Sequence, residues 1–137
     1  RYKSKKATSP VKTIEISLEG YTPHEITMEV AACAVHKGEI SAEATNFTRD
    51  IVNTTPDDCY PQIMAEVAET LAKENGLSCS ILKPKALKKE KMETLLAVAR
   101  ASRHKPRVIH LAHKPKHPKA VITLIGKGLT YDSGGLS

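Results

Sequence analysis

A lysine and an aspartate lie five positions apart in a glycine-rich turn near the end of the sequence, at Lys127 and Asp132. An aspartate is an ordinary ligand of divalent metal ions, and its two oxygens can bridge a pair of them. A lysine binds a metal only as the neutral amine, and a nearby dication drives the proton off by lowering the pKa of an amine. Together the two residues predict divalent-metal binding at this turn. The alternative is that Lys127 is simply a surface residue.

The residues before this turn predict the element that would position it. The run 121–125, Val-Ile-Thr-Leu-Ile, has the apolar character of a buried strand. In α/β proteins, glycine-rich loops that follow strands commonly carry the chemistry. Gly126 and Gly128 would let the backbone come close to a ligand and would leave room for a substrate.

The first 53 residues predict one strand followed by a long helical region. Apolar residues alternate with polar ones over 11–19, which indicates a strand with one buried face. Thr22 can cap a helix that begins at the proline after it, and the helical pattern continues toward Asn53. Gly38 marks a possible break between two helices. The apolar stripe of this region consists of Ile40, Ala44, Phe47 and Ile51.

Helices and strands alternate from residue 57 onward. A helix is predicted to begin at Pro61 and to end before Gly76. The elements predicted after it are a strand at 77–82, a helix at 86–97 with Leu87, Leu95 and Leu96 turned inward, and a strand at 108–111. This order favours a largely parallel or mixed sheet covered by helices.

The polar stretch 54–58 predicts a boundary between two domains. Residues 1–54 are expected to form the end of a small α/β amino-terminal domain and an interdomain helix. Residues 55–137 are expected to form the first helices and strands of a mixed-sheet α/β domain. The fold class is therefore α/β. Because the sequence stops inside its most specific motif, we expect it to be a piece of a larger enzyme.

Two other chemistries at the terminal turn are less consistent with the sequence. A phosphate-binding P-loop needs a glycine where Val121 stands and a serine or threonine where Gly128 stands. Ser133, in the run Asp-Ser-Gly-Gly, matches the loop around a serine-protease nucleophile. Such a nucleophile needs a histidine base on an all-β framework, and the sequence around this turn is rich in helix patterns.

The histidines form no convincing chelate. His110 and His113 are three apart on a predicted strand and would point to opposite faces. His113 and His117 have helical spacing, but Pro115 and Pro118 disfavour a helix there. Solvent-facing or strand-packed histidines are the favoured interpretation.

Cysteine usage and hydropathy indicate the compartment. The three cysteines, Cys33, Cys59 and Cys79, are far apart, which argues against a zinc knuckle or a disulfide scaffold. We expect small, buried or half-buried thiols in a reducing cytoplasm. No apolar run is long enough to cross a bilayer, and no signal peptide is recognisable at the first residues, so no membrane partner is expected.

The net charge of +6 is unevenly distributed. Residues 11–78 carry four positive and twelve negative charges, whereas residues 79–120 carry twelve positive and two negative charges. The alternative function that this suggests is a nucleic-acid-binding module using residues 83–119. Nucleic acid is nevertheless an unfavoured partner, because no aromatic residue in that region could stack on bases.

The terminal turn also resembles a known family. The run 126–135, Gly-Lys-Gly-Leu-Thr-Tyr-Asp-Ser-Gly-Gly, is similar to the metal-binding loop of the leucyl aminopeptidase (cytosol aminopeptidase) family. Residues 49–56 resemble the helix end that leads into the family's peptidase domain. Residues 92–102 and 106–109 resemble its next helix, loop and strand. The resemblance extends over 47–137, and the terminal motif is its most specific part.

The resemblance implies a dimetal exopeptidase. Lys127 matches the lysine ligand of one metal, and Asp132 matches the aspartate that bridges both metals. The expected cofactors are two divalent ions, Mn²⁺ or Zn²⁺, and the expected substrate is the free amino end of a peptide. The family's catalytic lysine would follow just beyond Ser137, so no catalytic residue is assigned within this chain.

The resemblance also implies an assembly. Family members form hexamers with enclosed active sites, so a homohexamer is expected for the intact protein. This chain by itself is expected to be inactive, because two ligands are too few to hold two ions.

Overall fold

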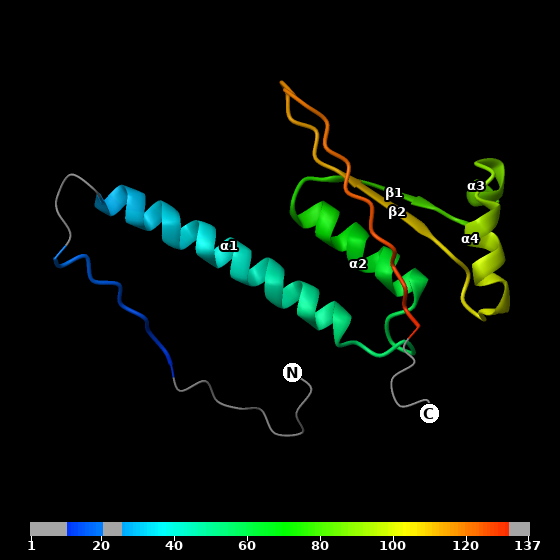
Figure 1. Cartoon of the computed structure of the whole chain (residues 1–137), viewed down its shortest axis with the longest axis horizontal. Coiled ribbons are helices and arrows are strands. Elements are labelled where there is room, and N and C mark those ends of the chain that lie inside the picture. The colour runs from blue at the N-terminus through cyan, green and yellow to red at the C-terminus, as the bar shows by residue number, and fades with distance from the viewer. Residues whose placement is uncertain (1–10, 21–25, 132–137) are drawn as a thin grey trace. The chain divides into compact units, whose positions relative to one another are not determined.

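The structure is a computed structural model that describes residues 11–20 and 26–131 (Figure 1). By contacts between its residues, the chain divides into two compact units, Arg1–Phe47 and Thr48–Ser137. The division falls inside a helix, and the predicted boundary at 54–58 stays a prediction.

Helix α1 is Met28–Val52, a single helix of 25 residues. Its first turn is capped by Thr27, whose Oγ1 accepts a hydrogen bond from the backbone N–H of Val30 at 3.2 Å. The predicted cap at Thr22 lies outside the described residues, and the two residues just before Met28 are not helical. The predicted break at Gly38 is wrong, because one glycine costs a helix only about 1 kcal/mol and neighbouring turns hold the conformation.

The strand predicted over 11–19 is absent from the described residues of the first unit. Ile14 and Ile16 are exposed, because no described segment pairs with their backbone. Leu18 is half-buried, and with Ile16 and Met28 it lines an open, mostly apolar groove of about 290 Å³ against α1. The face of α1 itself buries no residue completely.

Helix α2, Pro61–Glu74, confirms the predicted helix between a proline and a glycine. Proline suits the first turn because its missing N–H would have no partner there. After the helix, Gly76 takes a positive φ of 64°, a left-handed conformation that favours glycine. The N–H of Leu77 then donates to the carbonyl of Ala72 at 2.8 Å, which closes the helix end in a Schellman arrangement.

Strands β1, Ser78–Leu82, and β2, Val108–Ala112, confirm the two strands predicted on either side of the helical region at 84–101. They pair antiparallel, with Ser78 opposite Ala112 and Leu82 opposite Val108. The two strands of the described residues are therefore antiparallel, and the predicted largely parallel sheet is not formed there. The helices between the strands lie at one end of the pair (Figure 1). A six-residue helix is about 9 Å long, too short to carry the chain back along a strand of about 17 Å.

The helix predicted over 86–97 is two short helices, α3 Pro84–Lys89 and α4 Glu93–Val98, followed by the 3-10 turn η1, Ala99–Ala101. The break falls at Lys91, which has a φ of 55°. The N–H of Met92 donates to the carbonyl of Leu87 at 3.0 Å, so a lysine occupies the left-handed position that glycine usually fills. The sequence shows no glycine there, which is why one helix was predicted.

The core of the second unit lies where α2 packs against both strands and α3 packs against β1. Its buried residues are mostly small: Cys59, Ala65, Ala68, Ala72 and Leu87. The prediction that Leu87 points inward is confirmed, while Leu95 and Leu96 are half-buried. The three thiols are free, and Cys33 is exposed on α1 rather than buried or half-buried as expected.

The strand predicted at 121–125 is wrong for the described structure. Residues 113–131 form neither helix nor strand. The exposed fractions of Val121, Ile122, Leu124 and Ile125 are 89%, 84%, 92% and 94%. An apolar run becomes a strand only when a neighbouring strand accepts and donates its backbone hydrogen bonds, and no described segment does so. No helix in the described part of the chain is long and apolar enough to cross a membrane.

Candidate functional site

Lys127 lies on this irregular terminal segment with its side chain exposed. The backbone around it turns locally, because the N–H of Leu129 donates to the Lys127 carbonyl at 3.1 Å. A Cβ atom built on Gly126 or on Gly128 would meet nothing within 4 Å. The space beside both glycines is therefore open to a ligand.

The second predicted ligand, Asp132, lies outside the described residues, as does Ser133. The pairing of Lys127 with Asp132 on a metal therefore stays a prediction. Among residues 11–20 and 26–131, no three His, Cys, Asp or Glu side chains come together in a way that could hold a metal ion. The predicted pair consists of a lysine amine, from Lys127, and a carboxylate, from Asp132. Only Lys127 belongs to the described residues.

The chemistry of this donor set fits a divalent cation in two respects. Within the described residues, no carboxylate forms an ion pair with the Lys127 amine. The open space beside the flanking glycines also leaves an approach to the amine. A lysine that lost its proton to a nearby dication would offer one lone pair.

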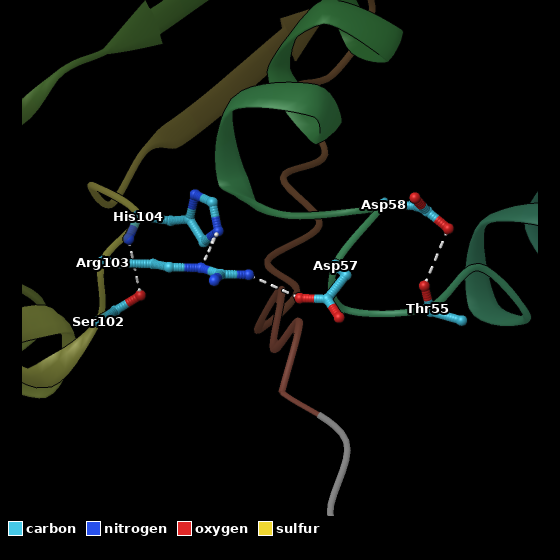
Figure 2. Close-up of polar contacts among 6 residues, drawn as sticks. All are labelled: Thr55, Asp57, Asp58, Ser102, Arg103 and His104. Atoms are coloured by element: carbon cyan, nitrogen blue, oxygen red, sulfur yellow. Dashed lines mark hydrogen bonds and ion pairs between the residues drawn. The ribbon is translucent and has the colours of Figure 1, made fainter.

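The described residues bring together a second polar cluster that the sequence did not predict (Figure 2). It joins the loop before α2 to the segment before β2. Arg103 Nη2 donates to Asp57 Oδ1 at 2.7 Å, and Arg103 Nε donates to His104 Nε2 at 3.1 Å. The His104 ring stacks on the Tyr60 ring, with centroids 3.9 Å apart and planes 17° apart. Arg103 and Asp57 are 46 positions apart, and no sequence pattern predicts that they interact.

Local hydrogen bonds shape both sides of this cluster. On one side, Thr55 Oγ1 donates to Asp58 Oδ2 at 3.0 Å, and the Thr55 carbonyl accepts from the N–H groups of Asp58 and Cys59. On the other side, the His104 N–H donates to Ser102 Oγ at 3.1 Å. The cluster contains an acid, a base and an aromatic ring, and its Arg103 and Asp57 side chains are 74% and 84% exposed. It therefore has the character of a surface link between two loops.

Comparison with known proteins places the chain in a family. The model of the cytosol aminopeptidase family, catalytic domain, matches residues 46–137, which is more than half of the chain. The chain belongs to the cytosol aminopeptidase family. This confirms the resemblance inferred from the terminal motif. The part of the chain from α2 to β2, with its antiparallel strand pair, is thus part of the family's catalytic domain.

Curated proteins give the same assignment over the whole chain. A probable cytosol aminopeptidase of Campylobacter jejuni is 49% identical over 138 residues, which covers 100% of this chain and 29% of that protein. The probable cytosol aminopeptidases of Wolinella succinogenes and Persephonella marina are 45% and 40% identical, over 99% and 100% of this chain and over 28% and 27% of their own lengths. The chain therefore spans less than a third of the cytosol aminopeptidases that it matches.

Proposed function

We propose that this chain is part of a leucyl aminopeptidase that removes the amino-terminal residue of peptides with the help of two divalent ions, Mn²⁺ or Zn²⁺. The observation that carries the proposal is the family match over 46–137, because that range includes the whole glycine-rich turn. The names of the relatives support aminopeptidase activity, and their full lengths include sequence that this chain does not cover.

In this proposal, Lys127 and Asp132 hold the metal ions. Lys127 would offer the lone pair of its neutral amine to the ions, and Asp132 would offer its carboxylate oxygens. When bound, the ions supply Lewis-acid chemistry that polarises the peptide carbonyl next to the free amino end. Gly126 and Gly128 contribute by having no side chains, which keeps the approach to the Lys127 amine open.

The assembly and compartment follow the same family assignment. We propose a homohexamer for the protein that contains this chain, and a cytoplasmic location in keeping with the name of its relatives. The chain on its own is proposed to be inactive. Two side chains are fewer than the three protein ligands that a single catalytic zinc ion usually takes.

The proposal can be tested with a chimera. This chain would replace the matching 138 residues of the Campylobacter jejuni relative, with which it shares 49% identity. The chimera is expected to hydrolyse leucine p-nitroanilide when supplied with Mn²⁺ or Zn²⁺. A chimera that folds and binds both ions but shows no hydrolysis would contradict the proposed function, as would activity of the isolated chain.

A substitution in the chimera tests the role of Lys127. Lys127→Met keeps the length of the side chain and removes the amine. Activity is expected to fall about 100-fold or more, since even the loss of residues that only support metal ligands costs 10–100-fold. Metal content measured by mass spectrometry should fall with it. The matched control is Lys119→Met, because Lys119 is also exposed on the irregular segment and is expected to leave activity and metal content unchanged.

A further inference from the structure

We propose that Asn75, at the end of α2, is a site of spontaneous deamidation, in which the backbone nitrogen of Gly76 displaces the side-chain amide of Asn75. The products are aspartate and isoaspartate at position 75. The chain has three asparagines, at positions 46, 53 and 75, and only Asn75 is followed by a glycine. This inference concerns the chain's own chemistry and does not rest on the proposed peptidase function.

The turn after α2 leaves the nucleophile accessible. Gly76 has no side chain to shield its backbone nitrogen, and its backbone can adopt conformations that other residues rarely reach. Asn75 and Gly76 are both exposed, so water and base from solution reach them. A Cβ atom built on Gly76 would meet nothing within 4 Å, so that side of the turn is open.

The backbone N–H of Gly76 has no acceptor among the residues that the structure describes. The hydrogen bonds of this turn come from its neighbours instead. The N–H of Asn75 donates to the Leu71 carbonyl at 3.1 Å, and the N–H of Leu77 donates to the Ala72 carbonyl at 2.8 Å. Removal of the Gly76 proton by a base therefore breaks no backbone hydrogen bond of the turn.

The reaction needs only a base and water from solution. The base takes the proton from the Gly76 nitrogen, which then bonds to the side-chain carbonyl carbon of Asn75. The side-chain nitrogen takes up a proton and leaves as ammonia, so a five-membered imide joins the two residues. Water then opens one of the two carbonyl–nitrogen bonds of the imide. Cleavage on the side-chain side gives aspartate, and cleavage on the main-chain side gives isoaspartate.

The closed turn holds the two reacting atoms apart. Asn75 has a ψ of 10°, so the Gly76 nitrogen lies on the side of the Asn75 backbone nitrogen and away from the Asn75 side chain. The Asn75 Nδ2 also donates to the Leu71 carbonyl at 2.9 Å, which holds the side chain back along the helix. Rotation to the reactive geometry breaks this bond and the bond from Leu77 to Ala72. Because helix ends open locally, the folded turn slows the reaction without preventing it.

Deamidation weakens this end of α2. An aspartate lacks the amide donor that Asn75 gives to the Leu71 carbonyl. Its new negative charge lies beside the exposed Glu74 at the carboxyl end of the helix, where the helix dipole favours positive charge. Isoaspartate also adds one carbon to the main chain in the turn that leads from α2 into β1 (Figure 1). The modification therefore loosens the junction between α2 and β1.

The test compares Asn75 with Asn53 in the unmodified chain. Asn53 is a matched control, because it also follows a helix, is exposed and donates its N–H to the carbonyl four residues earlier. The next N–H, from Thr54, donates to the Ile51 carbonyl at 3.1 Å and belongs to a residue with a side chain. The chain is kept in mildly alkaline buffer, and peptide mapping by mass spectrometry follows both positions.

Asn75 is expected to deamidate about tenfold or more faster than Asn53, because only its neighbour can approach closely. Isoaspartate is expected together with aspartate, because both come from the same imide. Equal rates at the two asparagines would overturn the proposal. Aspartate without isoaspartate would also overturn it, because direct hydrolysis of the side chain gives aspartate alone.

The variant Gly76→Ala tests the nucleophile. Its methyl group hinders the backbone nitrogen, while strain at the positive φ favours an open turn, so the two effects oppose each other. The rate at Asn75 is expected to fall about tenfold, and an unchanged or higher rate would overturn the proposal. The same comparison in urea, where neither chain is folded, gives this result whether or not the variant folds.

Urea also tests the closed turn in the unmodified chain. Deamidation of Asn75 is expected to be about tenfold faster in urea than in the folded chain, since two hydrogen bonds no longer hold the reacting atoms apart. Equal rates in the two conditions would overturn the protective role of the turn.

Discussion

Two regions of the second unit differ in burial: the packed part from Cys59 to Ala112, and the apolar run 121–125. Hydropathy predicts that the large aliphatic side chains of the run are buried, but the buried residues are mostly the small ones of the packed part. The packed part buries mainly small residues such as Ala65, Ala68 and Ala72. The run has four large aliphatic residues among its five, and all four are more than four-fifths exposed. Burial in this protein therefore depends on whether a neighbouring element is present, and apolar character alone does not produce it.

The hydrogen bonds of the two regions explain the difference. In the packed part, β1 and β2 satisfy each other's backbone groups, and α2 can then lay its alanine face on the pair. The run has no such partner among the described residues, so its side chains have no surface to pack against.

The largest effect is expected from Leu87→Ala. Leu87 is 0% exposed, and removing its side chain leaves a cavity between α3 and the rest of the core. The free energy of unfolding of the chain should fall by about 2–5 kcal/mol in urea denaturation. Leu129→Ala is the matched control, because Leu129 is 62% exposed and its truncation should change stability by less than about 0.5 kcal/mol. Equal losses at the two positions would refute the contrast.

The next effect is expected at the end of α2. Gly76→Ala places a Cβ on a residue with a φ of 64°, which should destabilise the chain by about 1–2 kcal/mol. Gly38→Ala provides the opposite case, since Gly38 lies inside α1 and a Cβ there meets nothing within 4 Å. It should raise helix stability by up to about 1 kcal/mol, measured by circular dichroism during thermal unfolding. A stabilising Gly76→Ala would show that the left-handed turn is not needed.

A smaller gain is expected at the break between α3 and α4. Lys91→Gly relieves the left-handed strain at a φ of 55° but adds backbone freedom to the unfolded chain, so a net stabilisation of about 0.5 kcal/mol is expected. Lys88→Gly, inside α3, should instead cost about 1 kcal/mol. Unfolding midpoints of the two variants should therefore move in opposite directions. A destabilised Lys91→Gly would mean that the two short helices are not separated by this residue.

The smallest effect is expected in the apolar run. Ile125→Ser should change the unfolding free energy of the chain by less than about 0.5 kcal/mol, because Ile125 is 94% exposed. In the chimera with the Campylobacter jejuni relative we expect a larger loss, since the sequence predicts a buried strand at this position. Urea denaturation of the Ile125→Ser variant, in the chain and in the chimera, shows whether the run 121–125 is buried in the longer protein. Equal and small effects in both hosts would rule out the buried strand.

The sequence was most informative where a local signal decides the structure. Pro61 and Gly76 bound α2 because a missing N–H and a left-handed turn are properties of single residues. The two strands on either side of α3 and α4 were also predictable, as was the inward-pointing Leu87. Metal binding by Lys127 and Asp132 is a prediction from the motif, and the family match supports the motif without testing either residue's role.

The sequence by itself determined the family, the limits of α2 and the positions of both paired strands, because these depend on residues that lie close together in the chain. Only the tertiary structure decided the antiparallel pairing of β1 with β2, the break at Lys91 and the link from Asp57 to Arg103. It also decided that the runs 11–19 and 121–125 stay unpaired among the described residues. The physical reason is that strand pairing and burial require a neighbouring segment. An apolar pattern in the sequence indicates that a segment can pair and pack, but it does not show which segment lies next to it in the folded protein.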